Sequence, residues 1–227
     1  MTQTDTLVSN SRPLTPAHED YLKAMYVLNL REQKVTNSLL AKYLKVTPTS
    51  ATNMVKKLAE LDLAEYEPYQ NITLTPAGER VALEVLRHHR LLELYLHEKL
   101  NLSWDQVHVE AEKLEHVMSD VLEDAIANAL GNPTIDPHGD PIPSKDGHME
   151  ALPGISLYTA EQGQRYQLVR VMIQDKERLD YLTEIGLRLS SELNLVECSP
   201  FDGPLLIEVD GKSHALAPEL AKLLIVV

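Results

Sequence analysis

Two histidines and three glutamates between His108 and His116 have the residue types and spacing of a metal-binding helix. With a helical period, four side chains share one stripe: His108, Glu112, Glu115 and His116. The neighbouring stripe is apolar and consists of Val107, Ala111, Leu114 and Met118. Imidazole and carboxylate groups beside a buried seam suit a divalent ion such as Mn, Fe, Co or Zn. The alternative interpretation is a solvated acidic face that happens to include histidines.

His89 and Glu93 lie four residues apart on a helix predicted from Thr75 to about Leu100, and they form a second pair of candidate ligands. Either residue could equally lie at the rim of an ordinary helix pair. The same helix is apolar over more than half of its circumference, which favours a dimer interface. Its seam contains Val81, Val85, Leu92 and Leu96.

The composition indicates a soluble globular protein with two or three domains, because the chain has 227 residues, of which 44% are hydrophobic and 24% charged. The net charge of −13 argues against indiscriminate binding to nucleic acid or anionic lipid, but it leaves room for a local basic patch. The single cysteine, Cys198, excludes an internal disulfide and fits a reducing cytoplasm. The first dozen residues contain no apolar run, so we expect no signal peptide, and no apolar stretch reaches membrane-spanning length.

The first 75 residues have the pattern of three helices followed by a β hairpin. Apolar residues at helical spacing predict helices at about 18–31, 36–45 and 50–61, and two short β-like runs lie at 63–66 and 71–75. Five lysines and no Asp or Glu occur between Lys34 and Lys57, although the chain carries 34 acidic residues. This order predicts a winged helix-turn-helix whose third helix enters the major groove of DNA.

Polar side chains are predicted to face outward at the start of the third helix. Hydroxyl and amide groups there can contact base edges or phosphates, and lysines suit phosphates. The candidate DNA-binding residues are Thr47, Thr49, Ser50, Asn53, Lys56 and Lys57. Arg31 is the only arginine in the predicted helices and hairpin of this head, so readout by shape or through water is favoured over guanine recognition by arginine. The alternative is a solvated face on a protein-interaction module.

Residues 131–154 contain five of the 13 prolines and are interpreted as a domain boundary and linker. Asp136, His138 and Asp140 fall in this segment and are interpreted as turn formers. The rest of the chain favours a small β-barrel, because it is rich in short strands. The strands are predicted at 166–173, at 205–209 before an Asp-Gly turn, and at 223–227, with a short helical turn at 180–186.

Three features together resemble the diphtheria toxin repressor family of iron- and manganese-dependent transcriptional repressors. They are the winged head, the run HVEAEKLEHVMSD at 108–120 and the run GNPTIDPHGDPIP at 131–143. The resemblance implies a mainly α protein with a small β domain. Its parts would be a winged helix-turn-helix DNA-binding domain at 1–75, a helical metal-binding and dimerisation domain at 76–143, a linker at 144–153 and an SH3-like, FeoA-like β-barrel at 154–227.

The same resemblance implies a cytoplasmic homodimer that binds palindromic double-stranded operator DNA when Mn(II) or Fe(II) is bound, and so controls metal-homeostasis genes. It implies no enzymatic activity, no organic cofactor and no membrane partner. By position, the primary metal site would use Asp20, Glu112, Glu115 and His116. The ancillary site would use His89, Glu93 and His108, with Asp175 and Glu177 as the nearest candidates from the β domain.

Asp20 and Glu112 stand where iron-responsive relatives carry methionine and cysteine. Because hard oxygen donors suit Mn(II), the resemblance favours a manganese-responsive protein in which Fe(II) is also competent. Lys23 departs from the glutamate with which some manganese-responsive members help to form a two-metal cluster.

Two other classes of function remain open from the sequence. A helical-bundle metalloenzyme would typically use Glu-x-x-His pairs, and the chain contains neither that motif nor His-Glu-x-x-His. A winged-helix regulator could instead sense an organic ligand or an oxidant, with Cys198 as its redox handle. Metal-dependent DNA binding, tested with a chelator, separates the three classes.

Overall fold

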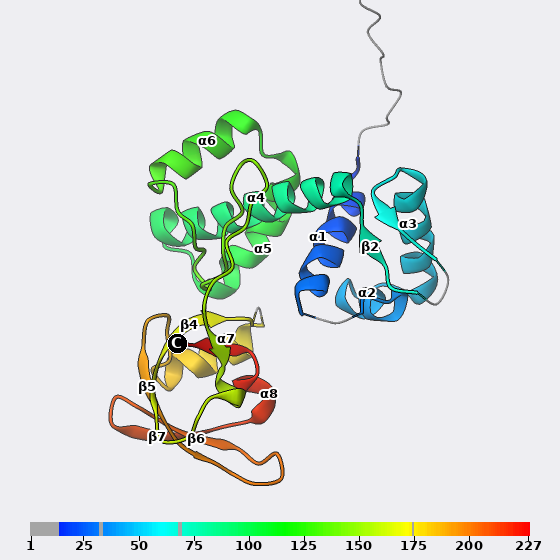
Figure 1. Cartoon of the computed structure of the whole chain (residues 1–227). Helices are drawn as coiled ribbons and strands as arrows, with labels where there is room; N and C mark the ends of the chain where they lie inside the picture. The colour runs from blue at the N-terminus through cyan, green and yellow to red at the C-terminus, as the bar shows by residue number, and fades with distance from the viewer. Residues whose placement is uncertain (1–13, 32–33, 68–69, 174) are drawn as a thin grey trace, which may run out of the picture. The chain divides into compact units, whose positions relative to one another are not determined.

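The computed structural model of the chain describes residues 14–31, 34–67, 70–173 and 175–227 (Figure 1). The chain divides into two compact units, Met1–Leu83 and Glu84–Val227, and the boundary falls within helix α4 (Pro76–Leu100). The first thirteen residues, where no signal peptide is expected, lie outside the described residues. The same holds for Pro68 and Tyr69 of the predicted hairpin turn.

The first unit is a winged helix-turn-helix, as the sequence predicts. Its elements are α1 (Pro16–Arg31), α2 (Asn37–Tyr43), α3 (Pro48–Glu60), β1 (Ala64–Glu65) and β2 (Thr73–Leu74), and the two strands pair antiparallel. Hydroxyl groups cap two of the helices, because Thr36 accepts from the Leu39 amide and Thr47 from the Ser50 amide. Pro48, at the first position of α3, has no N–H to leave unpaired there.

One face of each helix forms the core of this unit, with Leu22, Leu40 and Leu58 fully buried. The sequence also predicts Leu61 on the inner face of the third helix, but its side chain is 40% exposed. The reason is that α3 ends at Glu60, so that Leu61 is its C-cap and no longer follows the helical period.

The second unit begins with a helical region formed by α4, α5 (Trp104–Leu114), the 3₁₀ turn η1 (Glu115–Val117) and α6 (Asp120–Ala129). The helix predicted through Met118 therefore ends earlier, at Leu114. Met118 is extended, with φ −72° and ψ 125°, and Ser119 caps α6 by accepting from the Leu122 amide. A strong N-cap for the next helix interrupts the helical period of the metal-binding stretch.

The apolar residues of α4 that belong to the second unit are largely buried, among them Val85, Leu92 and Leu96 of the predicted seam. Leu91, Leu92 and Leu94 are buried in a core that also contains Ala111 and Ile126. Exposed apolar side chains lie instead on the segment that joins α5 to α6: Leu114, Val117, Val121 and Leu122. The sequence pattern placed the dimer surface on α4, whereas the structure leaves apolar surface on this other segment.

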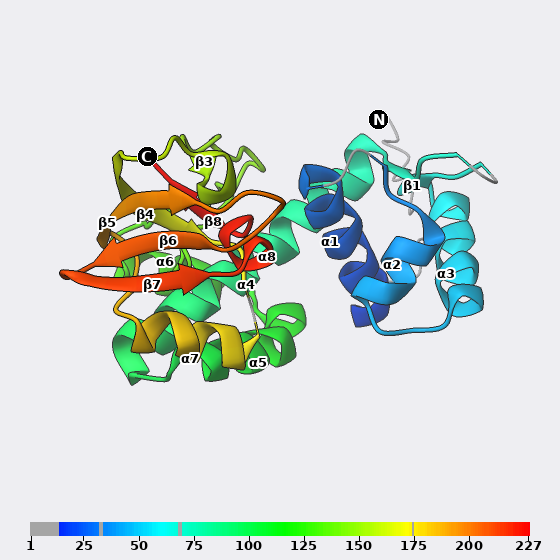
Figure 2. The same ribbon diagram turned by 90° about the horizontal axis from the view of Figure 1, so that it is seen from below.

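The C-terminal part is a six-stranded antiparallel sheet with the strand order β3-β8-β4-β5-β6-β7 (Figure 2). The strands are β3 (Ile155–Ser156), β4 (Arg165–Val171), β5 (Glu192–Cys198), β6 (Leu205–Val209), β7 (Lys212–Leu216) and β8 (Leu224–Val226). Asp210 and Gly211 have φ of 50° and 73°, the positive values that a tight hairpin between β6 and β7 needs.

Helices complete this region. They are η2 (Leu157–Thr159), α7 (Lys176–Glu184) and α8 (Pro218–Ala221). The predicted helical turn at 180–186 belongs to α7, which begins four residues earlier, at Lys176, and lies beside α5 (Figure 2). In the part of the chain that the structure describes, no helix combines the length and apolar character needed to cross a membrane.

The Pro-rich segment after α6 packs against the sheet. The Val171 amide donates to the His138 carbonyl at 2.9 Å. Gly139 has φ 85°, and a Cβ atom there would lie 2.1 Å from the Val169 carbonyl oxygen. Only glycine permits this approach, so the loop is fixed to β4 by its backbone.

Candidate metal centre

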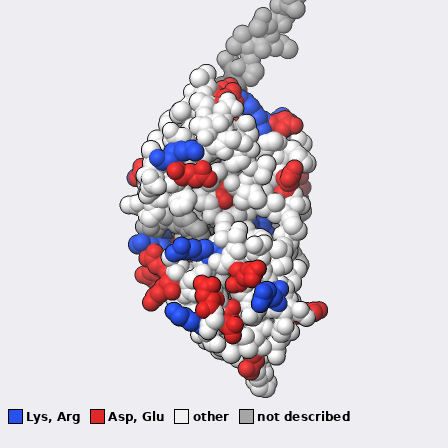
Figure 3. Space-filling view, turned by 90° about the vertical axis from the view of Figure 1, so that its left-hand side faces the viewer, with Lys and Arg blue, Asp and Glu red and all other residues white. Residues whose placement is uncertain are grey.

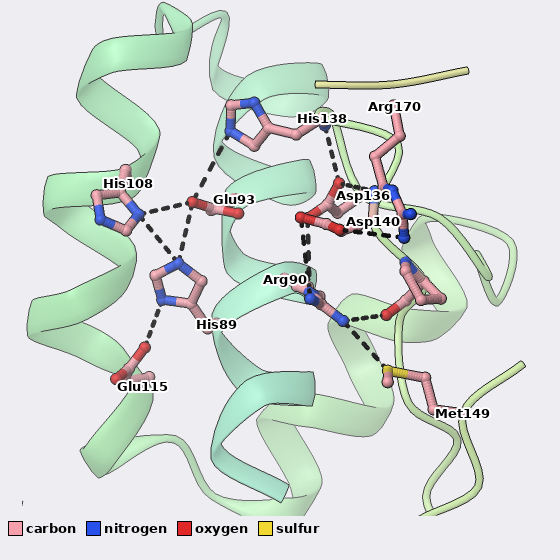
Figure 4. Close-up of polar contacts among 11 residues, drawn as sticks. His89, Arg90, Glu93, His108, Glu115, Asp136, His138, Asp140, Met149 and Arg170 are labelled. Atoms are coloured by element: carbon pink, nitrogen blue, oxygen red, sulfur yellow. Dashed lines mark hydrogen bonds and ion pairs between the residues drawn. The ribbon is translucent and has the colours of Figure 1, made fainter. Parts of the chain in front are cut away.

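Three side chains from two helices bring their ligand atoms together in the second unit (Figure 4). The Glu93 Oε1 atom lies 3.0 Å from His89 Nε2 and 3.0 Å from His108 Nδ1. The two nitrogens are 3.1 Å apart, and the rings meet edge to face at 76°. Helical spacing explains half of this geometry, because His89 and Glu93 are one turn apart on α4. Packing of α5 against α4 supplies His108.

The separations within this triangle match those of ligands around one ion. With metal–nitrogen bonds of about 2.1 Å, two ligands at a right angle lie about 3.0 Å apart. Glu93, His89 and His108 therefore present one triangular face of an octahedron, with two imidazoles and one carboxylate. Such a donor set suits Mn, Fe, Co or Zn. The same distances also allow hydrogen bonds in which the carboxylate accepts from both rings.

Glu93 is only 2% exposed, and its charge state depends on the imidazoles. Burial alone would raise its pKa, but the His89 charge, hydrogen bonds from His108 and His89, and the His138 charge outweigh burial. The Glu93 pKa is therefore held well below its usual value. An ionised carboxylate is the form that binds a cation.

His138, which the sequence interpretation missed, lies beside this triangle and outside the close ligand group of His89, Glu93 and His108. Its ring is buried, and its Nε2 lies 4.0 Å from Glu93 Oε1, within the distance of about 4.2 Å that separates opposite ligands of one ion. Burial, ahead of the opposing charges of Glu93 and Asp140, lowers the His138 pKa, which favours the neutral ring that metals bind.

The turn interpretation holds for Asp136, whose Oδ1 accepts from the His138 and Asp140 amides at 2.8 Å each. Treating His138 itself as a turn former is incomplete, because it faces the cluster. Local sequence gives little signal for this, since the loop has no period and its position depends on packing against β4.

Arg90 connects this loop to α4. Its guanidinium lies 3.7 Å from Asp136 and 3.9 Å from Asp140, and it donates to the Pro141 carbonyl. Burial, with the charges of Asp140 and Glu93, raises the pKa of Asp136 to about 8, against the opposing effect of Arg90. From the sheet, Arg170 lies 3.9 Å from Asp140 (Figure 4). The loop is thus held between α4 and β4.

The predicted primary ligands of the second unit lie at the end of α5. Glu115 is buried, and its carboxylate contacts His89 Nδ1 at 2.5 Å and His116 Nε2 at 3.4 Å. Glu112 is exposed, and its Oε1 lies 3.4 Å from His108 Nε2. Asp20 is half-buried on α1, in the first unit.

The structure gives Asp175 and Glu177 other positions. Asp175 is the N-cap of α7, where it accepts from the Arg178 amide at 3.1 Å and pairs with its guanidinium at 3.2 Å. Glu177 is exposed in the first turn of that helix. Within the described residues, the close ligand group at Glu93 contains neither of them. Their role as ligands stays a prediction.

The predicted DNA-contacting residues all lie on α3 or at its N-cap, and all are exposed: Thr47, Thr49, Ser50, Asn53, Lys56 and Lys57. The Thr47 hydroxyl also makes contacts within α3: it accepts a hydrogen bond from the Ser50 amide and lies 2.9 Å from the Ser50 hydroxyl. Figure 3 shows another face of the molecule, the one at the left of Figure 1, on which acidic and basic side chains of the described residues are interspersed.

Three family profiles match successive parts of the chain. Residues 13–72 match the N-terminal DNA binding domain of the iron dependent repressors. Residues 75–144 match the iron dependent repressor metal binding and dimerisation domain, and residues 155–227 match the FeoA domain. The candidate ligands of the second unit from His89 to His138 all fall in the second of these regions.

Individual relatives agree with the profiles. The diphtheria toxin repressor of Corynebacterium efficiens is 27% identical over 220 residues, covering 92% of this chain and 94% of that protein. The iron-dependent repressor IdeR of Mycobacterium leprae is 34% identical over 132 residues, which are 57% of this chain and 56% of that protein.

Solved structures extend the similarity to the whole chain. A manganese-dependent transcriptional repressor in complex with manganese has a TM-score of 0.87 and 36% identity, and the match covers 92% of this chain and 99% of that one. The manganese regulator SloR has a TM-score of 0.81 and 33% identity, covering 94% and 99%. These relatives are transcriptional regulators, which sets the metalloenzyme alternative aside. The chain therefore belongs to the diphtheria toxin repressor family of metal-dependent transcriptional repressors.

Proposed function

We propose that this repressor responds to Mn(II), with Fe(II) also competent, and that it binds palindromic operator DNA as a homodimer in the cytoplasm to control metal-homeostasis genes. The observation that carries this proposal is the triangle of Glu93, His89 and His108, whose ligand atoms are 3.0–3.1 Å apart. A donor set of two imidazoles and one carboxylate, without sulfur, can bind both Mn(II) and Fe(II).

The ancillary metal would be held by His89, Glu93 and His108, and we add His138 as a fourth candidate. The primary metal would be held by Asp20, Glu112, Glu115 and His116. The contact between His89 Nδ1 and the Glu115 carboxylate, at 2.5 Å, joins the two proposed ligand sets. When bound, the metal neutralises carboxylates that would otherwise repel each other.

The primary set provides the proposed switch. Asp20 belongs to the DNA-binding unit, and the other three ligands belong to the helical region of the second unit. A site that uses all four residues would restrict the DNA-binding unit to one orientation. Metal would then shift a population of orientations, and by reciprocity operator DNA would tighten metal binding.

We place the DNA contacts on the exposed start of α3. Asn53 would contact a base edge, and Lys56 and Lys57 would contact phosphates. Thr47, Thr49 and Ser50 lie at the N-terminus of the same helix, where hydroxyl and amide groups commonly contact phosphate oxygens.

We place the dimer contact on the α5–α6 segment. Val117 and Val121 are 74% and 80% exposed there, beside the less exposed Leu114 and Leu122. A cluster of apolar side chains at the surface is the usual composition of a homodimer interface. Ligand residues Glu115 and His116 lie on the same segment, so metal binding and dimer contact would share one structural element.

The experiment is an anaerobic titration of operator binding with Mn(II), Fe(II) and Zn(II) in turn, with a chelator as the reference. We expect Mn(II) and Fe(II) to activate binding, whereas Zn(II) binds tightly but activates poorly, because its tetrahedral preference does not organise an oxygen-rich site. A protein that responds to Zn(II) or Fe(II) and stays inert with Mn(II) would contradict the choice of metal.

The double variant Asp20→Met, Glu112→Cys tests the primary ligand set. Replacing two hard carboxylates by sulfur donors is expected to move the preference towards Fe(II). An unchanged order of metals in this variant would exclude these two positions from the site.

A further inference from the structure

Immediately before His89 on α4 lies a second buried histidine, His88, which neither proposed ligand set uses. Its side chain is 7% exposed and lies between two oxygen atoms from other elements. The Nδ1 atom is 3.1 Å from the backbone carbonyl oxygen of Glu115, and Nε2 is 3.4 Å from the Glu123 carboxylate. Since a carbonyl oxygen only accepts, Nδ1 is the donor in the first contact.

The Glu123 carboxylate is itself fixed by a cation. Arg87, one residue before His88, donates through Nε to Glu123 Oε1, and its second nitrogen donates to the Pro143 carbonyl at 2.8 Å. Glu123 is buried and lies in the first turn of α6, where a negative charge is favourable. His88 therefore meets a carboxylate that is anchored from another direction.

The Glu115 carbonyl group, which His88 contacts, lies where α5 ends and η1 begins. Glu115 is the C-cap of α5 and the first residue of η1, whose second residue is His116. Carbonyl groups at a helix end lack partners within the helix, so an external donor decides how the chain leaves it. His88 supplies that donor at the turn that carries two proposed metal ligands.

His88 and His89 are adjacent on α4, and they contact the backbone and the side chain of Glu115, respectively. His89 Nδ1 contacts its carboxylate at 2.5 Å, and His88 Nδ1 contacts its carbonyl oxygen at 3.1 Å. The Nε2 atom of the same ring lies 3.4 Å from the Glu123 carboxylate of α6. A side chain fixed at its backbone and at its head has little freedom left, which is the preorganisation that an outer-shell partner gives to a ligand.

We propose that His88 is a positioning residue for the primary metal site: its Nδ1–H donates to the Glu115 carbonyl and fixes the turn that presents Glu115 and His116. The inference rests on the proposed function, because it assumes that these two residues bind the metal. It assigns to His88 no contact with the ion itself.

Three variants at this position separate the contacts of the ring. His88→Asn places an amide N–H near the position of Nδ1, His88→Gln places one near Nε2, and His88→Leu removes both. The matched control is His97→Leu, because His97 is on the same helix and its Nδ1 also contacts a backbone carbonyl, that of Leu102, at 3.0 Å. It has no contact with Glu115 or Glu123.

Two measurements are made on the full-length protein. The first is Mn(II) affinity, measured from the electron paramagnetic resonance of free Mn(II). His88→Leu should lose about 10–100-fold, the usual range for outer-shell partners, while His88→Asn recovers most of the loss and His97→Leu shows none. The second is amide hydrogen exchange at 114–119 in metal-free protein, which should accelerate in His88→Leu and His88→Gln but not in His88→Asn or His97→Leu.

The inference is overturned if His88→Leu binds Mn(II) as the parent does, or if Gln restores binding and Asn does not. Equal losses in His88→Leu and His97→Leu would also overturn it, because they would indicate a general effect on α4. If the parent protein fails to bind Mn(II), the proposed function fails, and the exchange measurement then decides separately whether His88 fixes the turn.

Discussion

The proposed DNA-contacting helix α3 and the candidate metal centre differ in the solvent exposure of their polar side chains. On α3 the candidate contact residues are exposed, and one short stretch of sequence supplies all of them. In the metal centre, Glu93, His89 and His138 are buried, and the members come from α4, from α5 and from the loop after α6. The first surface is therefore local, whereas the second exists only after the unit has packed.

Desolvation explains why this difference matters. An exposed Asn or Lys on a helix keeps its water and can change with little effect on the fold, whereas a buried carboxylate needs a partner. Glu93 is held by two imidazoles, and Asp136, in the loop beside the centre, is held by Arg90 and two amides. Substitutions in the centre should therefore affect metal binding strongly, and those on α3 should affect only DNA binding.

The largest expected effect is the loss of metal-dependent operator binding in Glu115→Gln or His116→Ala. Both residues are proposed direct ligands, so the loss should exceed the range of roughly 10–100-fold that is typical of outer-shell groups. Operator affinity with Mn(II) and with chelator measures it, and size-exclusion chromatography checks the dimer. Glu110→Gln is the control, because Glu110 is on α5, directly before η1, and pairs with Lys113 at 2.7 Å. A variant that keeps the full metal response would show that its residue is not a primary ligand.

A smaller effect is expected for the loop histidine. His138→Leu should weaken the ancillary site about 10-fold or more, since it removes an imidazole 4.0 Å from Glu93 Oε1. Metal stoichiometry by equilibrium dialysis measures it. Asp175→Ala is the comparison variant and should leave the metal stoichiometry unchanged, because Asp175 caps α7 and pairs with Arg178. If Asp175→Ala reduces the stoichiometry and His138→Leu leaves it unchanged, the site extends towards α7 and excludes the loop.

On the reading helix, Asn53→Ala is expected to cost about 1–3 kcal/mol of operator binding and to relax sequence preference. Lys57→Ala should weaken binding to all sequences alike. It should also reduce the slope of log affinity against log salt concentration by about one. Binding isotherms on operator and scrambled duplexes at several salt concentrations distinguish them. Neither change should alter Mn(II) affinity in the absence of DNA. Equal losses on both duplexes for Asn53→Ala would restrict that side chain to phosphate contact.

The smallest expected effect is on the pH dependence of stability. Because the pKa of Asp136 is raised to about 8 in the fold, its contribution is fully present at low pH and is lost as pH rises towards that value. Between pH 6 and 7 the stability of the metal-free protein should therefore fall by at most about 1.4 kcal/mol from this group. Asp136→Asn should remove that slope, with Asp124→Asn as the exposed control. Denaturant unfolding followed by the fluorescence of the single tryptophan, Trp104, measures it. A slope that Asp136→Asn leaves unchanged would assign the pH dependence to other groups.

The sequence by itself determined the winged helix-turn-helix, the long helix α4 and the shared helix face of His89 and Glu93. Each rests on local chemistry: apolar periodicity, caps such as Thr47, and the one-turn spacing that places two side chains on the same face of a helix. The stripe from His108 to His116 and the strand-rich C-terminal part also followed from the sequence pattern, and the resemblance to repressors added Asp20, Asp175 and Glu177 as candidate ligands.

Only the tertiary structure decided where α5 ends, which apolar surface stays uncovered and which histidines meet Glu93. The helical period continues through Met118, but the cap at Ser119 starts a new helix, and the donor from His88 reaches the carbonyl at the end of α5. His138 joins the centre because Gly139 lets its loop lie against β4. Apart from the local cap at Ser119, these positions depend on contacts between segments far apart in the chain, and local periodicity contains no information about such contacts.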